Sequence, residues 1–245
     1  MEQELPPPRP VITPSMEQAI NQARHGKTNP VYLKTKDTEI TGKDMRLLRD
    51  YEWLNDEVMN CTLKLIQGRN ADKGLQKVFC STTFFLPKLL LRGHAESKRL
   101  LQDTDVFEYN LWIVPYNQNK HWSLFMVDNI KRRLTYYDSY LVSYKENKEK
   151  KKVARPLPDT KCFKALRDFL ENEHLRLKGT KLLHQYTTFT DLNAPQQDNG
   201  FDCGVFAFQF AECLSRGTPF DFSHADIPYF RKKMAWEILT NKFFE

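Results

Sequence analysis

Residues 195–214, PQQDNGFDCGVFAFQFAECL, join an amide-rich polar turn to a segment that is apolar on nearly every side. From Val205 onward this pattern predicts a helix buried in the middle of a domain. Cys203 then lies at the N-terminus of that helix, where free amide groups and the positive end of the helix dipole favour a thiolate. Gly204 removes side-chain bulk beside the sulfur. A buried cysteine is more often inert, but a polar turn is a poor place to bury a thiol, so Cys203 is a candidate nucleophile.

A reactive thiol needs a base, a group that holds the base, and donors for an oxyanion. The sequence offers His121 beside a tryptophan, Asp138 in the run YYDS, and Gln197 in the cysteine turn. Each also has a simpler interpretation: a strand-end histidine bonded to a carbonyl, an aspartate that caps a turn, and a surface glutamine. One mechanism accounts for all three together with Cys203, and the five other histidines lack an adjoining aromatic strand and an aspartate partner.

The stretch 111–139, LWIVPYNQNKHWSLFMVDNIKRRLTYYDS, contains three β-rich segments and predicts an antiparallel meander. A four-residue loop between Asp128 and Arg133 would pair these two residues and place His121 on the same face as Asp138. Diagonal neighbours of this kind have Cβ atoms about 7–8 Å apart, within reach of an aspartate and an imidazole. A loop of three or five residues would turn one of them away, so the spacing allows the contact without proving it.

Composition favours one domain in a reducing compartment. The 245 residues, 40% of them hydrophobic, are enough to bury a substantial core. The net charge of +6 is spread along the chain and does not imply nucleic acid as a partner. The five cysteines contain no CxxC pair, and neither a signal peptide nor a long apolar run is visible. We therefore expect no membrane insertion and a location in the nucleus and/or the cytoplasm.

The remaining cysteines do not predict a metal site. Cys61, Cys80, Cys162 and Cys213 lie among apolar residues, where a cysteine acts as a small hydrophobe. A zinc site needs clustered ligands, and Cys162 with His174 has no matching second pair.

The other segments predict short helices and strands around the meander and the cysteine helix. We expect the proline-rich start over 1–14 to be extended or flexible, without a contribution to the core. A helix capped by Ser15 and stopped by Gly26 should follow, and then a strand from Val31, a helix from Thr41 and a longer helix from Asn55 or Asp56 to Gly68. Further along the chain we expect a strand or helix within 78–91, a helix over 161–177 and an edge strand over 184–192. Residues 145–158, KENKEKKKVARPLP, predict a solvated loop, with a nuclear-import signal as the alternative.

Four motifs resemble the Ulp-type cysteine proteases, and most closely the sentrin/SUMO-specific proteases. They are WLNDE at 53–57, HWSL at 121–124, YYDS at 136–139 and PQQDNGFDCG at 195–204. The order His, Asp, Cys is that of this family, and the run IPYFRKKMAWEIL at 227–239 is similar to its animal sentrin-specific branch. The resemblance covers residues 15–245, which we interpret as one catalytic domain behind the flexible tail 1–14.

The resemblance implies a papain-like α+β fold of the Ulp/adenain type, with a central mixed sheet flanked by helices and the nucleophile at the N-terminus of a buried helix. It also implies cleavage after the C-terminal Gly-Gly of SUMO, both in precursors and at target lysines, by a monomer without a cofactor. Carried over by position, Cys203 is the nucleophile, His121 the general base and acid, Asp138 its orienting partner and Gln197 an oxyanion donor.

By the same resemblance, Trp53 and Trp122 form a narrow slot that flattens the diglycine tail, and Asp56 contacts a basic patch on SUMO. The alternatives are ordinary core packing for each tryptophan and a helix cap for Asp56.

Two features depart from the family pattern. The basic insertion after Tyr140 is longer and richer in lysine, and Leu86 and Pro87 interrupt an aromatic run. These departures bear on the choice of modifier and leave the triad intact. Two other functions stay open, a protease for a Nedd-type modifier and a noncatalytic SUMO-binding module. The ending IPYFRKKMAWEIL favours SUMO, and the presence of every triad residue favours an enzyme.

Overall fold

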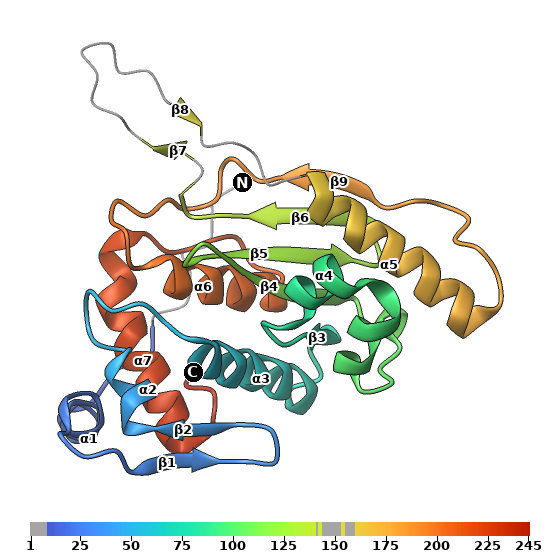
Figure 1. Cartoon of the computed structure of the whole chain (residues 1–245). Coiled ribbons are helices and arrows are strands. Elements are labelled where there is room, and N and C mark those ends of the chain that lie inside the picture. The colour runs from blue at the N-terminus through green and yellow to red at the C-terminus, as the bar shows by residue number, and fades with distance from the viewer. Residues whose placement is uncertain (1–8, 141, 144–152, 155–159) are drawn as a thin grey trace.

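A five-stranded mixed sheet forms the centre of the molecule in the computed structural model, which describes residues 9–140, 142–143, 153–154 and 160–245. Its strand order is β3-β4-β5-β6-β9, with β3 at Val78–Cys80, β4 at Leu111–Gln118, β5 at His121–Asp128, β6 at Arg133–Tyr137 and β9 at Thr187–Thr190. The central three strands form the predicted antiparallel meander, whereas β3 and β9 run parallel to their neighbours. The segment expected as an edge strand therefore contains β9, at one edge of this sheet (Figure 1).

Helices cover both faces of the sheet, because side chains alternate along its buried strands. On β5, Leu124 and Met126 belong to one hydrophobic cluster, and Phe125 and Val127 belong to another. The first cluster includes residues of α3 (Asp56–Asp72), α6 (Cys203–Arg216) and α7 (Ile227–Thr240). The second includes residues of α4 (Phe85–Ser97) and α5 (Thr160–Lys178). Helix α6 thus lies against the sheet within the core, as its apolar sequence predicts (Figure 1).

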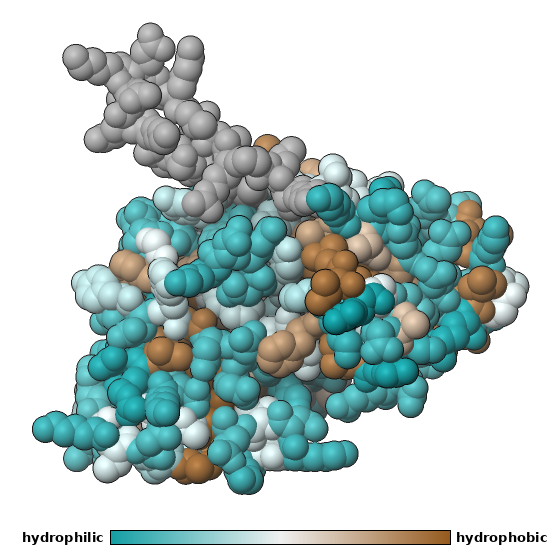
Figure 2. Space-filling model, viewed as in Figure 1, coloured by the Kyte–Doolittle hydropathy of each residue, from teal (hydrophilic) through white to brown (hydrophobic). Residues whose placement is uncertain are grey.

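The remaining elements are short and lie around these layers. They are α1 (Pro14–His25), α2 (Gly42–Arg46), the paired strands β1 (Val31–Lys34) and β2 (Glu39–Thr41), the paired strands β7 (Val142–Ser143) and β8 (Val153–Ala154), and the 3-10 turns η1 (Lys98–Leu101), η2 (Val106–Glu108) and η3 (His224–Asp226). The face seen in Figure 2 is mostly hydrophilic, with its hydrophobic residues in small separate patches.

The register of the meander is the one that the four-residue loop predicts. Asp128 pairs with Arg133 across the loop. Strand β5 begins at His121, and β6 ends at Tyr137, one residue before Asp138. Both side chains therefore lie at the same end of this strand pair.

Helix α3 is longer than the sequence predicts, because it does not stop at Gly68 but continues to Asp72. The last turn is held by tertiary contacts. Arg69 is buried and paired with Glu212, and the amide of Asn70 donates to the carbonyl of Ser215. These contacts outweigh the roughly 1 kcal/mol that a glycine costs in a helix interior.

The N-terminal segment also differs from expectation. Helix α1 begins at Pro14 and its cap is Thr13, whose hydroxyl accepts from the backbone N–H of Met16, so Ser15 is not the cap. Ile12 packs against the core, and the hydroxyl of Tyr229 donates to the carbonyl of Pro10. Part of the proline-rich start therefore contacts the folded body. The charged loop predicted over 145–158 lies outside the described residues, apart from the two residues of β8.

Candidate active site

Three side chains from separate elements meet where β5 begins, β6 ends and α6 begins. The sulfur of Cys203 interacts electrostatically with the imidazole of His121, whose Nε2 lies 2.6 Å from Oδ1 of Asp138. Because Nε2 is occupied by the carboxylate, Nδ1 is the ring nitrogen available to the sulfur. The predicted contact between His121 and Asp138 is confirmed, and the sulfur completes a line of three groups.

The carboxylate of Asp138 is fixed by donors other than the histidine. Its Oδ2 accepts from the hydroxyl of Tyr136 at 2.9 Å, and its Oδ1 accepts from the backbone N–H of Tyr140 at 2.8 Å. The side chain is buried, so these bonds operate with little competition from water. The imidazole therefore has a rigid partner that determines which way its ring faces.

The electrostatics of the pair favour a charged histidine. Burial alone disfavours an imidazolium, but the hydrogen bonds to Asp138 and Cys203 and the charges of these groups outweigh it and raise the pKa of His121 to about 9. An imidazolium at neutral pH is the state that stabilises a neighbouring thiolate. The arrangement is therefore suited to nucleophilic chemistry by sulfur.

Gln197 is buried beside this line and held by three bonds. Its backbone N–H donates to the carbonyl of Ser139 at 2.7 Å, and its side-chain Oε1 accepts from the hydroxyl of Ser139 at 2.6 Å. Its Nε2 donates to the carbonyl of Asn199 at 2.5 Å. The interpretation of Gln197 as a surface glutamine is wrong, because the side chain is 6% exposed.

The turn before Cys203 is shaped by Asn199. Its Oδ1 accepts from the backbone N–H groups of Phe201 and Asp202, both at 3.1 Å, and its Nδ2 donates to the carboxylate of Asp202 at 2.7 Å. Packing against Leu54 gives a second reason for a glycine at position 204. A Cβ at this position would lie 2.9 Å from Cβ of Leu54, so the glycine lets α6 approach the segment that carries Trp53.

A buried arginine of α7 joins this turn to the segment before Trp53. The guanidinium of Arg231 donates to Asp202 Oδ1 at 2.6 and 3.1 Å, and to the carbonyls of Leu47, Arg49 and Glu52 at 2.8–3.2 Å. Asp202 immediately precedes the cysteine. One side chain of the IPYFRKKMAWEIL run thus connects the turn before Cys203 to a second stretch of chain.

The two tryptophans have unequal surroundings. Trp53 is 48% exposed, donates to the carbonyl of Gly200 at 2.9 Å, and has Nζ of Lys120 5.4 Å from its ring centroid. Trp122 is 2% exposed, lies in the core cluster, and donates to the carbonyl of Leu54 at 2.8 Å. Both rings are fixed to backbone near the cysteine, but only Trp53 presents a free surface.

Asp56 is the first residue of α3 and is partly exposed. The cap of that helix is Asn55, whose side chain accepts from the N–H of Val58 at 3.1 Å. The alternative of Asp56 as the helix cap is therefore wrong.

Three of the other cysteines lie where burial disfavours a thiolate. Burial raises the pKa of Cys61, Cys80 and Cys213 to about 12, which keeps these thiols protonated. Within the described ranges, His, Cys, Asp and Glu side chains form no group of three or more that is suited to a metal ion. None of the helices in the described part of the chain has the length and apolar character needed to span a membrane.

Sequence reasoning missed several residues that support the site. Tyr136 and Ser139 flank Asp138 within YYDS, and Asn199 lies inside the cysteine turn, so their places in the motifs were an available signal. No local pattern identifies Arg231, because its partners are 29 or more residues away in the chain.

Comparisons with known proteins agree with this geometry. Residues 52–242 match the family described as "Ulp1 protease family, C-terminal catalytic domain". A sentrin-specific protease of Caenorhabditis elegans is 33% identical over 219 residues, and sentrin-specific protease 2 of Homo sapiens is 34% identical over 231 residues. These alignments cover 89% and 93% of this chain but 29% and 37% of the relatives, so the chain spans about a third of their length.

Two solved structures share the fold over nearly the whole chain. The yeast Ulp1 C-terminal protease domain, solved in complex with the yeast ortholog of SUMO, has a TM-score of 0.77 and 24% identity over 98% of each chain. The Ulp1-like SUMO protease catalytic domain of Chaetomium thermophilum has a TM-score of 0.76 and 25% identity over 98% of this chain and 96% of that one. The α+β fold that the motifs imply is thus confirmed, and the chain belongs to the Ulp1 protease family.

Proposed function

We propose that this chain is a SUMO-specific cysteine protease that cleaves after the C-terminal Gly-Gly of SUMO. It would mature SUMO precursors at a peptide bond and release SUMO from target lysines at an isopeptide bond. The observation that carries the proposal is the convergence of Cys203, at the N-terminus of a buried helix, with the hydrogen-bonded pair His121 and Asp138. The modifier is inferred from relatives that are named as sentrin-specific or SUMO proteases.

In the first half of the reaction, the thiolate of Cys203 attacks the carbonyl carbon of the terminal glycine. The imidazolium of His121, whose pKa is raised to about 9, gives its proton to the departing lysine amine. Asp138 keeps the ring in place throughout. Water then hydrolyses the thioester, with the neutral imidazole as base, which returns the proton to His121 and frees the sulfur.

The developing oxyanion has two donors in this proposal. Nε2 of Gln197 carries a second hydrogen beyond the one given to Asn199. The backbone N–H of Cys203 is among the first amides of α6, which have no acceptor inside the helix. Removing one such donor commonly costs about 3–4 kcal/mol of transition-state stabilisation.

The two tryptophans would confine the diglycine tail, which has no side chains to clash with them. Because Trp122 is covered and Trp53 is half-exposed, Trp53 is the wall that would adjust when the tail enters. Asp56, partly exposed at the start of α3, would contact a basic patch on SUMO. We extend the catalytic domain to residues 15–245 and place the enzyme, as a monomer without nucleic acid or cofactor, in the nucleus and/or cytoplasm.

Fluorogenic C-terminal conjugates of SUMO, a Nedd-type modifier and ubiquitin test the proposal directly. We expect turnover of the SUMO conjugate well above the other two. A folded protein that is inactive on all three would contradict an enzymatic function, and preference for the Nedd-type conjugate would replace the modifier. Cys203→Ala, which keeps the fold, is the control for contaminating proteases.

A further inference from the structure

Two consecutive residues after β6 are tied to two consecutive residues of the cysteine turn. The side-chain Nε2 of Gln196 donates to the backbone carbonyl of Asp138 at 2.9 Å, and the backbone N–H of Gln197 donates to the backbone carbonyl of Ser139 at 2.7 Å. A third bond, from the hydroxyl of Ser139 to Oε1 of Gln197 at 2.6 Å, joins two buried side chains. The segment that orients His121 through Asp138 therefore also holds the glutamine.

The third bond decides which end of the glutamine amide faces which way. The carbonyl of Asn199 can only accept a hydrogen bond, so the nitrogen end of Gln197 must face it. The oxygen end then faces the hydroxyl of Ser139, which supplies the donor that this oxygen needs. Both ends of the amide are satisfied in one orientation, and a flipped amide would bring two oxygens together at Asn199.

We propose that Ser139 is a positioning residue that fixes the Gln197 amide with its nitrogen available to the oxyanion. The inference rests on the proposed function, because it concerns the same reaction. Without the hydroxyl, Oε1 of Gln197 is buried without its side-chain donor, and the amide loses one of the two bonds that hold its orientation. Ser139 acts only through Gln197 and does not touch the substrate.

A double-mutant cycle on kcat separates this role from general packing. The four proteins are wild type, Ser139→Ala, Gln197→Ala and the double variant, assayed on the SUMO conjugate with active protein counted by thiol titration of Cys203. We expect Ser139→Ala to lower kcat roughly 10-fold in the wild-type background, with KM changed less than about 2-fold. In the Gln197→Ala background the same change should lower kcat by less than about 2-fold.

The matched control is Ser215→Ala, which removes another buried hydroxyl from the far end of α6. Ser215 Oγ accepts from Arg69 at 2.6 Å and donates to the carbonyl of Glu212 at 2.7 Å. This variant should lower the melting temperature and leave kcat unchanged.

An equal loss of kcat from Ser139→Ala in both backgrounds, or no loss in the wild type, would overturn the positioning role while the wild-type activity still supports the protease. Ser139→Thr keeps a hydroxyl and should retain more activity than Ser139→Ala if the hydroxyl is what matters. A wild-type protein without SUMO-cleaving activity would overturn both the proposed function and this inference.

Discussion

Helix α6 carries a buried cysteine near each end, and the two differ in their neighbours rather than in their burial. Cys203 is 2% exposed and Cys213 is 1% exposed. At the N-terminal end, the neighbour of the sulfur is an imidazole that is charged at neutral pH. At the C-terminal end, burial and then the carboxylates of Glu212 and Asp221 raise the pKa of Cys213 to about 12. Reactivity therefore depends on which charge faces the sulfur and which end of the helix it occupies.

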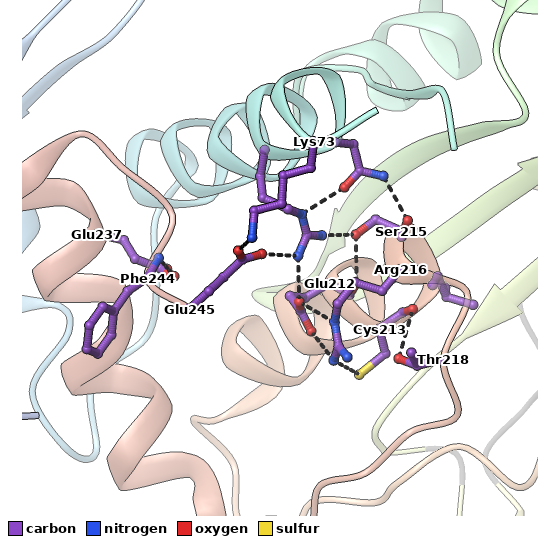
Figure 3. A network of polar contacts seen from close by, with 12 residues as sticks. Lys73, Glu212, Cys213, Ser215, Arg216, Thr218, Glu237, Phe244 and Glu245 are labelled. Atoms are coloured by element: carbon purple, nitrogen blue, oxygen red, sulfur yellow. Dashed lines mark hydrogen bonds and ion pairs between the residues drawn. The ribbon is translucent and has the colours of Figure 1, made fainter. Parts of the chain in front are cut away.

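The charged network around Cys213 is structural. Figure 3 shows Glu212 and Arg216 beside Cys213 at this end of α6, with Glu245 and Lys73 close by. Glu212 accepts from Nε and Nη2 of Arg216 at 2.7 and 2.8 Å, and from Nη1 of Arg69 at 3.1 Å. Glu212 thus pairs with Arg216 within α6 and with Arg69 of α3, and the second pair joins the two helices.

The largest difference between the two ends should appear on removal of each sulfur. Cys203→Ala removes the proposed nucleophile and should lower turnover of a SUMO conjugate by roughly 10⁴-fold or more. Cys213→Ala leaves the reaction groups in place and should change turnover by less than about twofold, with a stability loss of about 1 kcal/mol. Steady-state kinetics and thermal melting of both variants check this. Comparable losses of activity would show that the ends are not functionally distinct.

The charge on His121 gives the second test. Asp138→Asn removes the partner that raises its pKa, while the burial that lowers it stays. We expect kcat/KM to fall by roughly 10²–10⁴-fold and the basic limb of its pH profile to move below the wild-type value near pH 9.

The same pair affects stability with a defined sign. The pKa of His121 in the folded protein, about 9, lies above its ordinary value of 6.5. The pairing of His121 with Asp138 therefore contributes fully to the free energy of unfolding below pH 6.5, and this contribution is lost as the pH rises through 9. Urea unfolding should show the gap between wild type and Asp138→Asn narrowing as the pH rises through 9. A gap that widens there would contradict a charged His121.

Two buried arginines, one near each end of α6, allow a matched test of the difference between these ends. Arg231→Lys weakens the connection between Asp202 and the segment before Trp53, whereas Arg69→Lys weakens the network at Glu212. Each change should cost about 1–3 kcal/mol of stability. Only Arg231→Lys should lower kcat/KM, by roughly 10- to 100-fold, because it lets the cysteine turn shift against Trp53. Equal activity of the two folded variants would remove this distinction.

The smallest effect is expected from Gly68→Ala, on the turn of α3 that carries Arg69. A Cβ at this exposed position meets nothing within 4 Å. The change should stabilise the protein by about 0.5–1 kcal/mol through its helix propensity, without altering turnover. Chemical denaturation measures the gain, and a loss of stability would mean that the helix is strained at this point.

Much of the site followed from local sequence. The four-residue loop predicted between Asp128 and Arg133 is observed, and the apolar run after Cys203 forms the buried helix that it predicts. Contacts between segments that are distant in the chain could not be predicted from local sequence. The end predicted at Gly68 was wrong because Arg69 and Asn70 are held by α6.

The sequence by itself determined that an apolar helix follows Cys203 and that a four-residue loop would bring His121 beside Asp138, because helix and strand periodicities are local properties. Only the tertiary structure decided that the sulfur reaches that histidine and that Ser139 and Arg231 hold the surrounding turn. Those contacts join segments distant in the chain, and their formation depends on how the core packs rather than on any residue's neighbours in sequence.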